Sequence, residues 1–267
     1  GYGAEVDLQP SIADAFAKIE HYTNDGMTFV HPFDDPLVIA GQGTVGLEIM
    51  EDLPETTDVI ASIGGGGMAC GVAAAVKGVE PSARIWGVET EGADAMAQAL
   101  AAGRPVDLPA ITSIAKTLGA PSVSAFTLEL AERLLENVTV VSDAEAVKAM
   151  AFILERLKVI TEPAAACTLS AAHRLRENFG PGTRLVLVFC GGNAGPGDLC
   201  GYLERFGAAW RNLPARPSTQ KLFATRYRVC PAAHLTPSPL APLLPLLPWW
   251  IQPLSVPSDA SRLSSTF

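Results

Sequence analysis

The chain has 267 residues, 48% of them apolar and 18% charged, which is enough for one large domain or two modest ones with a sizeable core. A net charge of −9, without any cluster of lysines and arginines, argues against a nucleic-acid partner. The sequence contains no recognisable signal peptide and no apolar run long enough to span a bilayer, so no membrane association is predicted. Five cysteines without a CxxC pair fit neither a disulfide framework nor a zinc site and favour a reducing compartment, the cytoplasm.

Residues 1–207 alternate short apolar runs with alanine-rich periodic segments. Four runs predict β-strands, at Val59–Ile63, Arg84–Glu89, Val138–Val141 and Leu185–Phe189. Five periodic segments predict helices, at Gly67–Lys77, Asp94–Ala102, Ala125–Leu135, Asp143–Leu157 and Pro163–Asn178. Strands that alternate with helices of this length indicate an α/β fold in which helices cover both faces of a parallel sheet.

Particular residues mark the expected ends of these helices. Gly78, Gly103 and Gly180 stand where C-caps are expected, because glycine readily adopts the left-handed conformation that ends many helices. Asp143 is predicted to be an N-cap and Pro163 to be the first residue of its helix.

A GxGxxG pattern at Gly41–Gly46 matches the outline of a dinucleotide-binding loop and precedes a helix-like stretch, Leu47–Glu51. The segment before it, Leu37–Ala40, is a poor strand because it follows Pro36, and no strand about twenty residues later ends in the expected acid. We therefore interpret the pattern as the glycine-rich start of a helix that packs against its neighbours, with nucleotide binding as the alternative.

Four consecutive glycines follow the predicted strand that ends at Ile63 and precede a predicted helix. Glycines permit positive φ and let backbone N–H groups approach a ligand closely. The start of the next helix adds unpaired N–H groups and a positive dipole end. A tight turn would need only one glycine, so the run at Gly64–Gly67 predicts a phosphate site that needs no lysine.

Two further segments stand at the ends of predicted elements. Cys190-Gly191-Gly192-Asn193 directly follows the last strand, at the edge of an open α/β sheet where ligands bind. Cys190 either meets a ring heteroatom there or is an ordinary buried cysteine, and its residue type alone favours the second. Glu162 opens the last helix, where a carboxylate either caps the helix or faces the pocket.

Residues 208–267 differ in composition from the rest of the chain. They hold ten of the 21 prolines and three of the four tryptophans, with one acid against six lysines and arginines. This composition predicts a disordered tail. A frameshifted or artificial extension and a proline-rich partner motif are the alternatives.

Together these motifs resemble fold-type II pyridoxal-phosphate enzymes, and most closely threonine/serine dehydratases, which are similar to serine racemases. The resemblance covers about residues 1–205 and rests on five segments: Phe29–Thr44, Gly64–Met68, a strand ending in Glu89, Thr161–Pro163 and Cys190–Asn193. It implies that residues 1–35 are a remnant of a small domain and that residues 36–207 form the large cofactor-binding domain. Because the chain starts Gly1-Tyr2, we expect it to be an amino-terminally truncated piece of a longer protein.

The resemblance also implies roles for individual residues. Gly64, Gly65, Gly66 and Gly67, with Met68, would hold the phosphate of pyridoxal 5'-phosphate. Cys190 would sit at the pyridine nitrogen, and Glu162 would lie near the active site. Glu89 matches a divalent-cation ligand of some family members. A second acidic ligand is expected near position 95, but Ala95 stands there and the nearest acid, Asp94, is displaced by one residue. No metal site is therefore predicted.

The family reaction implied is β-elimination of a hydroxy amino acid to a 2-oxo acid and ammonia by a cytoplasmic homodimer. It needs a Schiff-base lysine in a Ser-x-Lys-x-Arg motif as covalent anchor and base. None of the chain's six lysines stands in that motif: Lys18, Lys77, Lys116, Lys148, Lys158 and Lys221. We therefore expect this chain alone to be inactive. The alternatives are a Rossmann-type nucleotide-binding oxidoreductase fragment and a non-catalytic protein on the same scaffold.

Overall fold

The computed structural model describes residues 3–10 and 12–206. The elements below all belong to the unit Gly1–Pro214, one of the two into which the chain divides. The predicted disordered tail at 208–267 lies outside the described residues. Among the described helices, none is long and apolar enough to cross a membrane.

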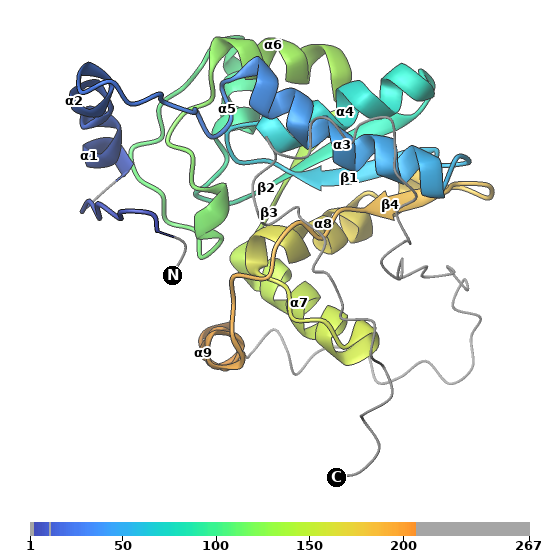
Figure 1. The fold of residues 1–267 in the computed structure, drawn as a ribbon. Helices are drawn as coiled ribbons and strands as arrows, with labels where there is room; N and C mark the ends of the chain where they lie inside the picture. The colour runs from blue at the N-terminus through green and yellow to red at the C-terminus, as the bar shows by residue number, and fades with distance from the viewer. Residues whose placement is uncertain (1–2, 11, 207–267) are drawn as a thin grey trace, which may run out of the picture. The chain divides into compact units, whose positions relative to one another are not determined.

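The described part of the chain is built on a four-stranded parallel sheet with the strand order β3-β2-β1-β4 (Figure 1). The strands are β1 (Asp58–Ser62), β2 (Arg84–Thr90), β3 (Asn137–Val141) and β4 (Leu185–Leu187). All four predicted strands are confirmed, although β4 ends two residues early. Ser62 pairs with Val88 and Ile60 with Leu187, so the carboxyl ends of β1, β2 and β4 meet at one edge of the sheet.

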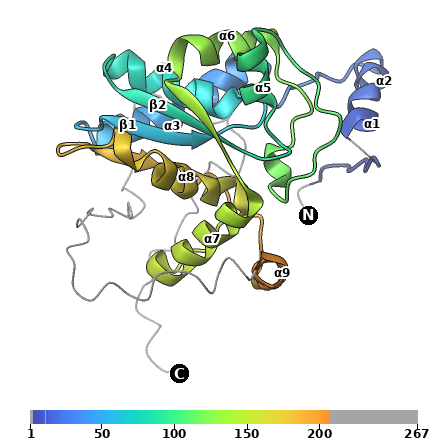
Figure 2. The ribbon, with the colours of Figure 1, turned by 180° about the vertical axis from the view of Figure 1, so that it is seen from behind.

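Helices cover both faces of the sheet, as predicted (Figures 1 and 2). On one side lie α4 (Gly67–Val79), α5 (Ala95–Ala102) and α6 (Ala125–Leu134), with α3 (Pro36–Asp52) packed on α4. On the other, α8 (Pro163–Arg174) contacts every strand, and α7 (Asp143–Leu157) and α9 (Pro196–Phe206) follow outward. The remaining elements are short: α1 (Ile12–Ala17), α2 (Ile19–Asn24), η1 (Lys116–Leu118) and η2 (Arg176–Asn178).

The alternating side chains of β1 divide the core between these two layers. Val59 packs with the cluster around α4, whereas Ile60 packs with Trp86 and the buried face of α8. Every residue of β1 is buried, which is why its three central residues, Val59–Ala61, are all apolar rather than alternating with polar ones.

The GxGxxG pattern lies inside α3, which also contains Leu37–Ala40, so no strand directly precedes it and the dinucleotide alternative is wrong. The carboxylate of Asp35 caps α3 by accepting bonds from the N–H groups of Leu37 and Val38, at 2.7 and 3.3 Å. The helix therefore begins at Pro36, well before the expected start. A dinucleotide loop requires a turn between strand and helix. The packing interpretation is confirmed, because Gly43 and Gly46 face α4.

The expected helix ends are partly confirmed. Gly103 is a left-handed C-cap with φ +64, and Pro163 is the first residue of α8. Gly78 instead lies within α4, which continues to Val79, and Gly180 lies beyond the C-caps of both α8 and η2. Asp143 is not an N-cap.

Ser142 caps α7 instead, in a capping box with Glu145. Its hydroxyl accepts a bond from the N–H of Glu145, and the Glu145 carboxylate accepts one from the N–H of Ser142. Asp143 is thereby freed to accept bonds from the Ser113 hydroxyl, at 2.6 Å, and from the N–H of Ile114.

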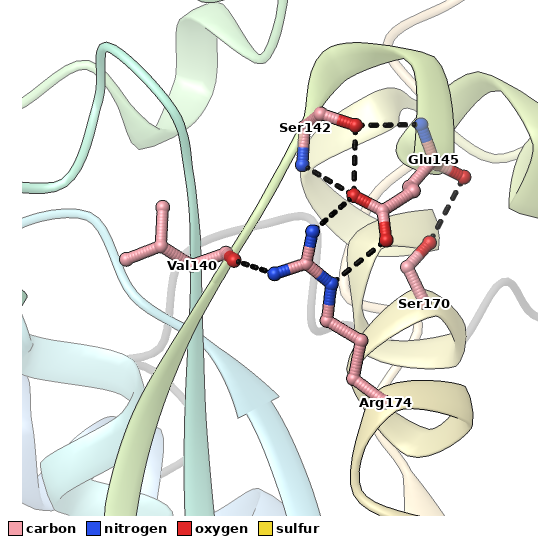
Figure 3. A network of polar contacts seen from close by, with 5 residues as sticks. All are labelled: Val140, Ser142, Glu145, Ser170 and Arg174. Atoms are coloured by element: carbon pink, nitrogen blue, oxygen red, sulfur yellow. Dashed lines mark hydrogen bonds and ion pairs between the residues drawn. The ribbon is translucent and has the colours of Figure 1, made fainter.

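Glu145 also joins α7 to α8 and β3 through Arg174 (Figure 3). The Arg174 guanidinium donates two bonds to the Glu145 carboxylate, at 2.7 and 2.6 Å, and a third to the carbonyl of Val140, at 2.7 Å. The Ser170 hydroxyl donates to the Glu145 carbonyl at 2.9 Å. Desolvation opposes ionisation of Glu145, but the bonds from Arg174 and Ser142 prevail and lower its pKa to about 2.

Candidate active site

The glycine loop leaves β1 at the carboxyl edge of the sheet and enters α4. The N–H of Ile63 still bonds to the carbonyl of Val88, at 2.8 Å, and α4 begins at Gly67. Gly66 is the N-cap in the left-handed conformation, with φ +99. A Cβ at Gly66 would also lie 2.9 Å from Met96 Cε and 3.0 Å from Thr127 Cβ, so only glycine fits there.

The backbone N–H groups of this loop lack acceptors among the described residues. Those of residues 64–68 have no hydrogen-bond partner within the described part of the chain, although Gly65, Gly66 and Gly67 are buried. Buried unpaired N–H groups are costly, and several of them converging at a helix start form a site for an anion. This arrangement fits the phosphate of pyridoxal phosphate, which would accept these bonds.

Cys190 lies beside the base of the glycine loop. Its Sγ is 3.4 Å from the Oγ of Ser62, the last residue of β1. The residue is exposed, so the alternative of a buried structural cysteine is wrong. Desolvation around the sulfur, together with the neighbouring Glu162 carboxylate, raises the pKa of the Cys190 thiol, which is therefore neutral at pH 7.

Glu162 is the N-cap residue of α8, but its side chain makes no capping bond. Its carboxylate lies against Gly191, and it accepts hydrogen bonds from Thr117 and from the backbone of Asn193. Burial raises the pKa of Glu162 above its usual value, and only 7% of the residue is exposed. The capping alternative is therefore wrong, and the side chain faces the segment that follows β4.

Glu89 is fully buried, and its carboxylate holds the start of α5. It accepts bonds from the N–H groups of Met96 and Ala97, at 2.9 and 2.8 Å. Burial raises the pKa of Glu89 to about 8. Both carboxylate oxygens are thus engaged by the helix start, and no cluster of three metal-ligating side chains occurs among the described residues.

The structure therefore gathers the predicted site residues at one edge of the sheet, with two additions that the sequence did not reveal. Thr117, in η1, contacts Glu162 and lies beside the loop, because a Cβ at Gly64 would be 3.5 Å from its carbonyl oxygen. Ser62 contacts Cys190 from the end of β1. Ser62 begins the segment Ser62–Met68 that carries the family resemblance, but its contact with Cys190 was not predicted, and no motif marks Thr117.

Comparison with known proteins agrees with this geometry. Residues 1–191 match the family described as pyridoxal-phosphate dependent enzyme. The chain is 37% identical over 195 residues to the L-threonine ammonia-lyase of Thermotoga maritima, covering 72% of this chain and 48% of that protein.

Two solved structures are also similar. A threonine deaminase from T.th. has a TM-score of 0.67 and 34% identity, covering 73% of this chain and 65% of that one. Maize serine racemase has a TM-score of 0.68 and 33% identity, covering 79% and 65%. The chain thus spans about half of the curated ammonia-lyase and about two thirds of each solved relative.

Proposed function

The chain belongs to the family of pyridoxal-phosphate dependent enzymes, and we propose that it is the cofactor-binding part of a threonine/serine ammonia-lyase. Such an enzyme converts a hydroxy amino acid into a 2-oxo acid and ammonia. The observation that carries the proposal is the row of N–H groups at residues 64–68 that have no partner within the described part of the chain, with Gly65, Gly66 and Gly67 buried, next to Cys190 and Glu162. The similarity to an L-threonine ammonia-lyase supports the choice of substrate class.

In this proposal each group has a distinct task. The N–H groups of Gly64, Gly65, Gly66, Gly67 and Met68 bind the cofactor phosphate and fix its position. The neutral thiol of Cys190 would meet the pyridine nitrogen, and Glu162, whose pKa burial raises above its usual value, would lie near the reacting groups. When bound, the cofactor supplies an electron sink, and a neutral partner at its ring nitrogen suits β-elimination better than transamination.

The missing lysine sets the first test. The reaction needs a lysine as anchor and base, and no lysine of this chain stands in the Ser-x-Lys-x-Arg motif. We expect the purified 267-residue chain, given L-threonine and pyridoxal phosphate, to form no 2-oxobutanoate. Turnover by this chain would show that another residue performs the lysine's task and would refute the expected inactivity.

Cofactor affinity tests the cradle independently of catalysis. Gly66→Ala introduces a side chain at positive φ against Met96 and Thr127, so we expect pyridoxal phosphate to bind about tenfold more weakly by calorimetry. Gly103→Ala is the matched control, because it also has positive φ but no atom within 4 Å of the added Cβ. Equal weakening in both variants, or binding of NAD in place of pyridoxal phosphate, would contradict the proposal.

A non-catalytic protein on the same scaffold is the remaining alternative. The coding sequence upstream of Gly1 separates the two, because an in-frame Ser-x-Lys-x-Arg segment would support the enzyme and a stop codon the alternative. We also propose that the parent protein is a cytoplasmic homodimer. The cysteine content supports the compartment, and sedimentation of the full-length protein tests the assembly.

A further inference from the structure

We propose that Phe33 is a positioning residue that holds the glycine loop in the conformation that binds phosphate. This inference rests on the proposed function and assigns a task to a residue that precedes α3 and is 31 positions before the loop. Phe33 packs against Gly65 and Gly67, so it would act on the ligand through the backbone of the loop.

The contacts around the loop carry the argument. The ring of Phe33 occupies the space that a Cβ at Gly65 would need, and a Cβ at Gly67 would lie 2.9 Å from Phe33 Cα and 3.1 Å from its carbonyl oxygen. Gly64 faces the backbone of Leu118. The loop is therefore packed by side chains and backbone on several sides, while its own N–H groups stay unpaired within the described part of the chain.

The register between α3 and α4 brings Phe33 to this position. Helix α3 packs along α4 (Figure 1). The two backbones lie close together, because a Cβ at Gly43 would lie 3.2 Å from the carbonyl oxygen of Gly71 and one at Gly46 would lie 2.7 Å from that of Val72. Phe33 precedes the first residue of α3 by three positions and lies beside Gly65 and Gly67, where the chain enters α4.

The side chain of His31 fixes the turn that presents Phe33. The Nδ1 of His31 accepts bonds from the N–H groups of Phe33, at 3.3 Å, and Asp34, at 2.8 Å. The two rings also pack edge to face, with centroids 4.6 Å apart. Phe33 thus has a defined backbone and ring orientation before any ligand binds.

A glycine-rich cradle needs such support because glycine loses the most conformational entropy when it is ordered. A loop of four glycines that is ordered only by its ligand would bind that ligand weakly. Packing by Phe33 orders the loop when the protein folds. The conformational entropy lost in ordering the loop therefore no longer weakens ligand binding. Removing the ring should therefore loosen the loop and lower phosphate affinity, with little change elsewhere in the sheet.

The test compares Phe33→Leu and Phe33→Ala with Phe179→Leu in the 267-residue chain. Phe179 is the matched control, because it is also partly buried but packs on Trp86, in the core on the α8 side of the sheet. The readouts are ¹⁵N order parameters of Gly64–Gly67 and the affinities for inorganic phosphate and pyridoxal phosphate. Phe33→Tyr, which keeps the ring, should behave like the wild type.

We expect the Phe33→Ala order parameters to fall from about 0.85 to below about 0.6, and affinity to fall about tenfold, whereas Phe179→Leu changes neither. If the alanine variant does not fold, Phe33→Leu is compared with Phe179→Leu instead, and the expected falls in order parameter and affinity are smaller. Unchanged order parameters in both Phe33 variants would overturn the inference. Failure of the wild type to bind either ligand would instead refute the proposed function, and the order parameters alone would then decide the role of Phe33.

Discussion

Gly46→Ala tests whether the glycines of α3 serve helix packing. A methyl group there would lie 2.7 Å from the Val72 carbonyl oxygen and 2.9 Å from Ala75 Cβ. Because the first of these atoms belongs to the backbone, the two helices must move apart. Overpacking of this kind costs about 1–3 kcal/mol, and replacing a helical glycine by alanine returns up to about 1 kcal/mol. We therefore expect the free energy of unfolding to fall by up to about 2 kcal/mol.

Gly41→Ala is the matched control in the same helix. Nothing lies within 4 Å of a Cβ at Gly41, so only the helix-propensity gain remains, and the free energy of unfolding should rise by about 0.5–1 kcal/mol. Urea unfolding followed by circular dichroism at 222 nm measures both variants. The packing argument is refuted if Gly46→Ala stabilises the protein as much as Gly41→Ala does.

Three further predictions concern charge and burial. Glu145 has a folded-state pKa of about 2, below its usual value, so its stabilisation is present above about pH 4.5 and lost as the pH falls toward 2. Glu145→Gln should therefore cost about 1–2 kcal/mol at pH 7 and little at pH 2.5, by urea unfolding at each pH, whereas a constant difference would contradict the ion pair. Asp58→Asn should cost about 2 kcal/mol, because this buried carboxylate accepts a hydrogen bond from Trp86 Nε1, at 2.9 Å, and forms an ion pair with Arg84 Nε, at 2.8 Å. A melting temperature equal to that of the wild type would count against this prediction. Burial raises the pKa of the Cys70 thiol to about 12, so iodoacetamide at pH 8 should modify the exposed Cys200 and spare Cys70 in the native protein, as peptide mass spectrometry would reveal.

Glu129→Gln is a control for the Glu145 experiment. Glu129 pairs with Arg133 at 3.4 Å, but both side chains are more than 60% exposed. Such a pair contributes little in water, so its loss should leave the pH dependence of unfolding unchanged.

The local sequence was sufficient to predict the four strands and the five helices α4 to α8, but not α9 or the true start of α3. The residues Val59–Ala61 are all apolar because both faces of β1 are buried, and this pattern is visible without a structure. The glycine run at Gly64–Gly67 likewise indicated an anion site, since its backbone requirements are local. Helix ends were less predictable, because Ser142 rather than Asp143 made the capping bonds.

Tertiary structure decided what each ambiguous motif does. The glycines at Gly41–Gly46 suit a turn and a tight helix contact equally well, and only the position of α4 distinguishes the two. Glu162 leaves the helix end uncapped because Thr117 and Asn193, from separate segments, reach its carboxylate. Phe33 contacts the glycine loop through the packing of two helices. These assignments depend on contacts between distant segments, whereas the identities of the strands and of the glycine loop depend on neighbouring residues alone.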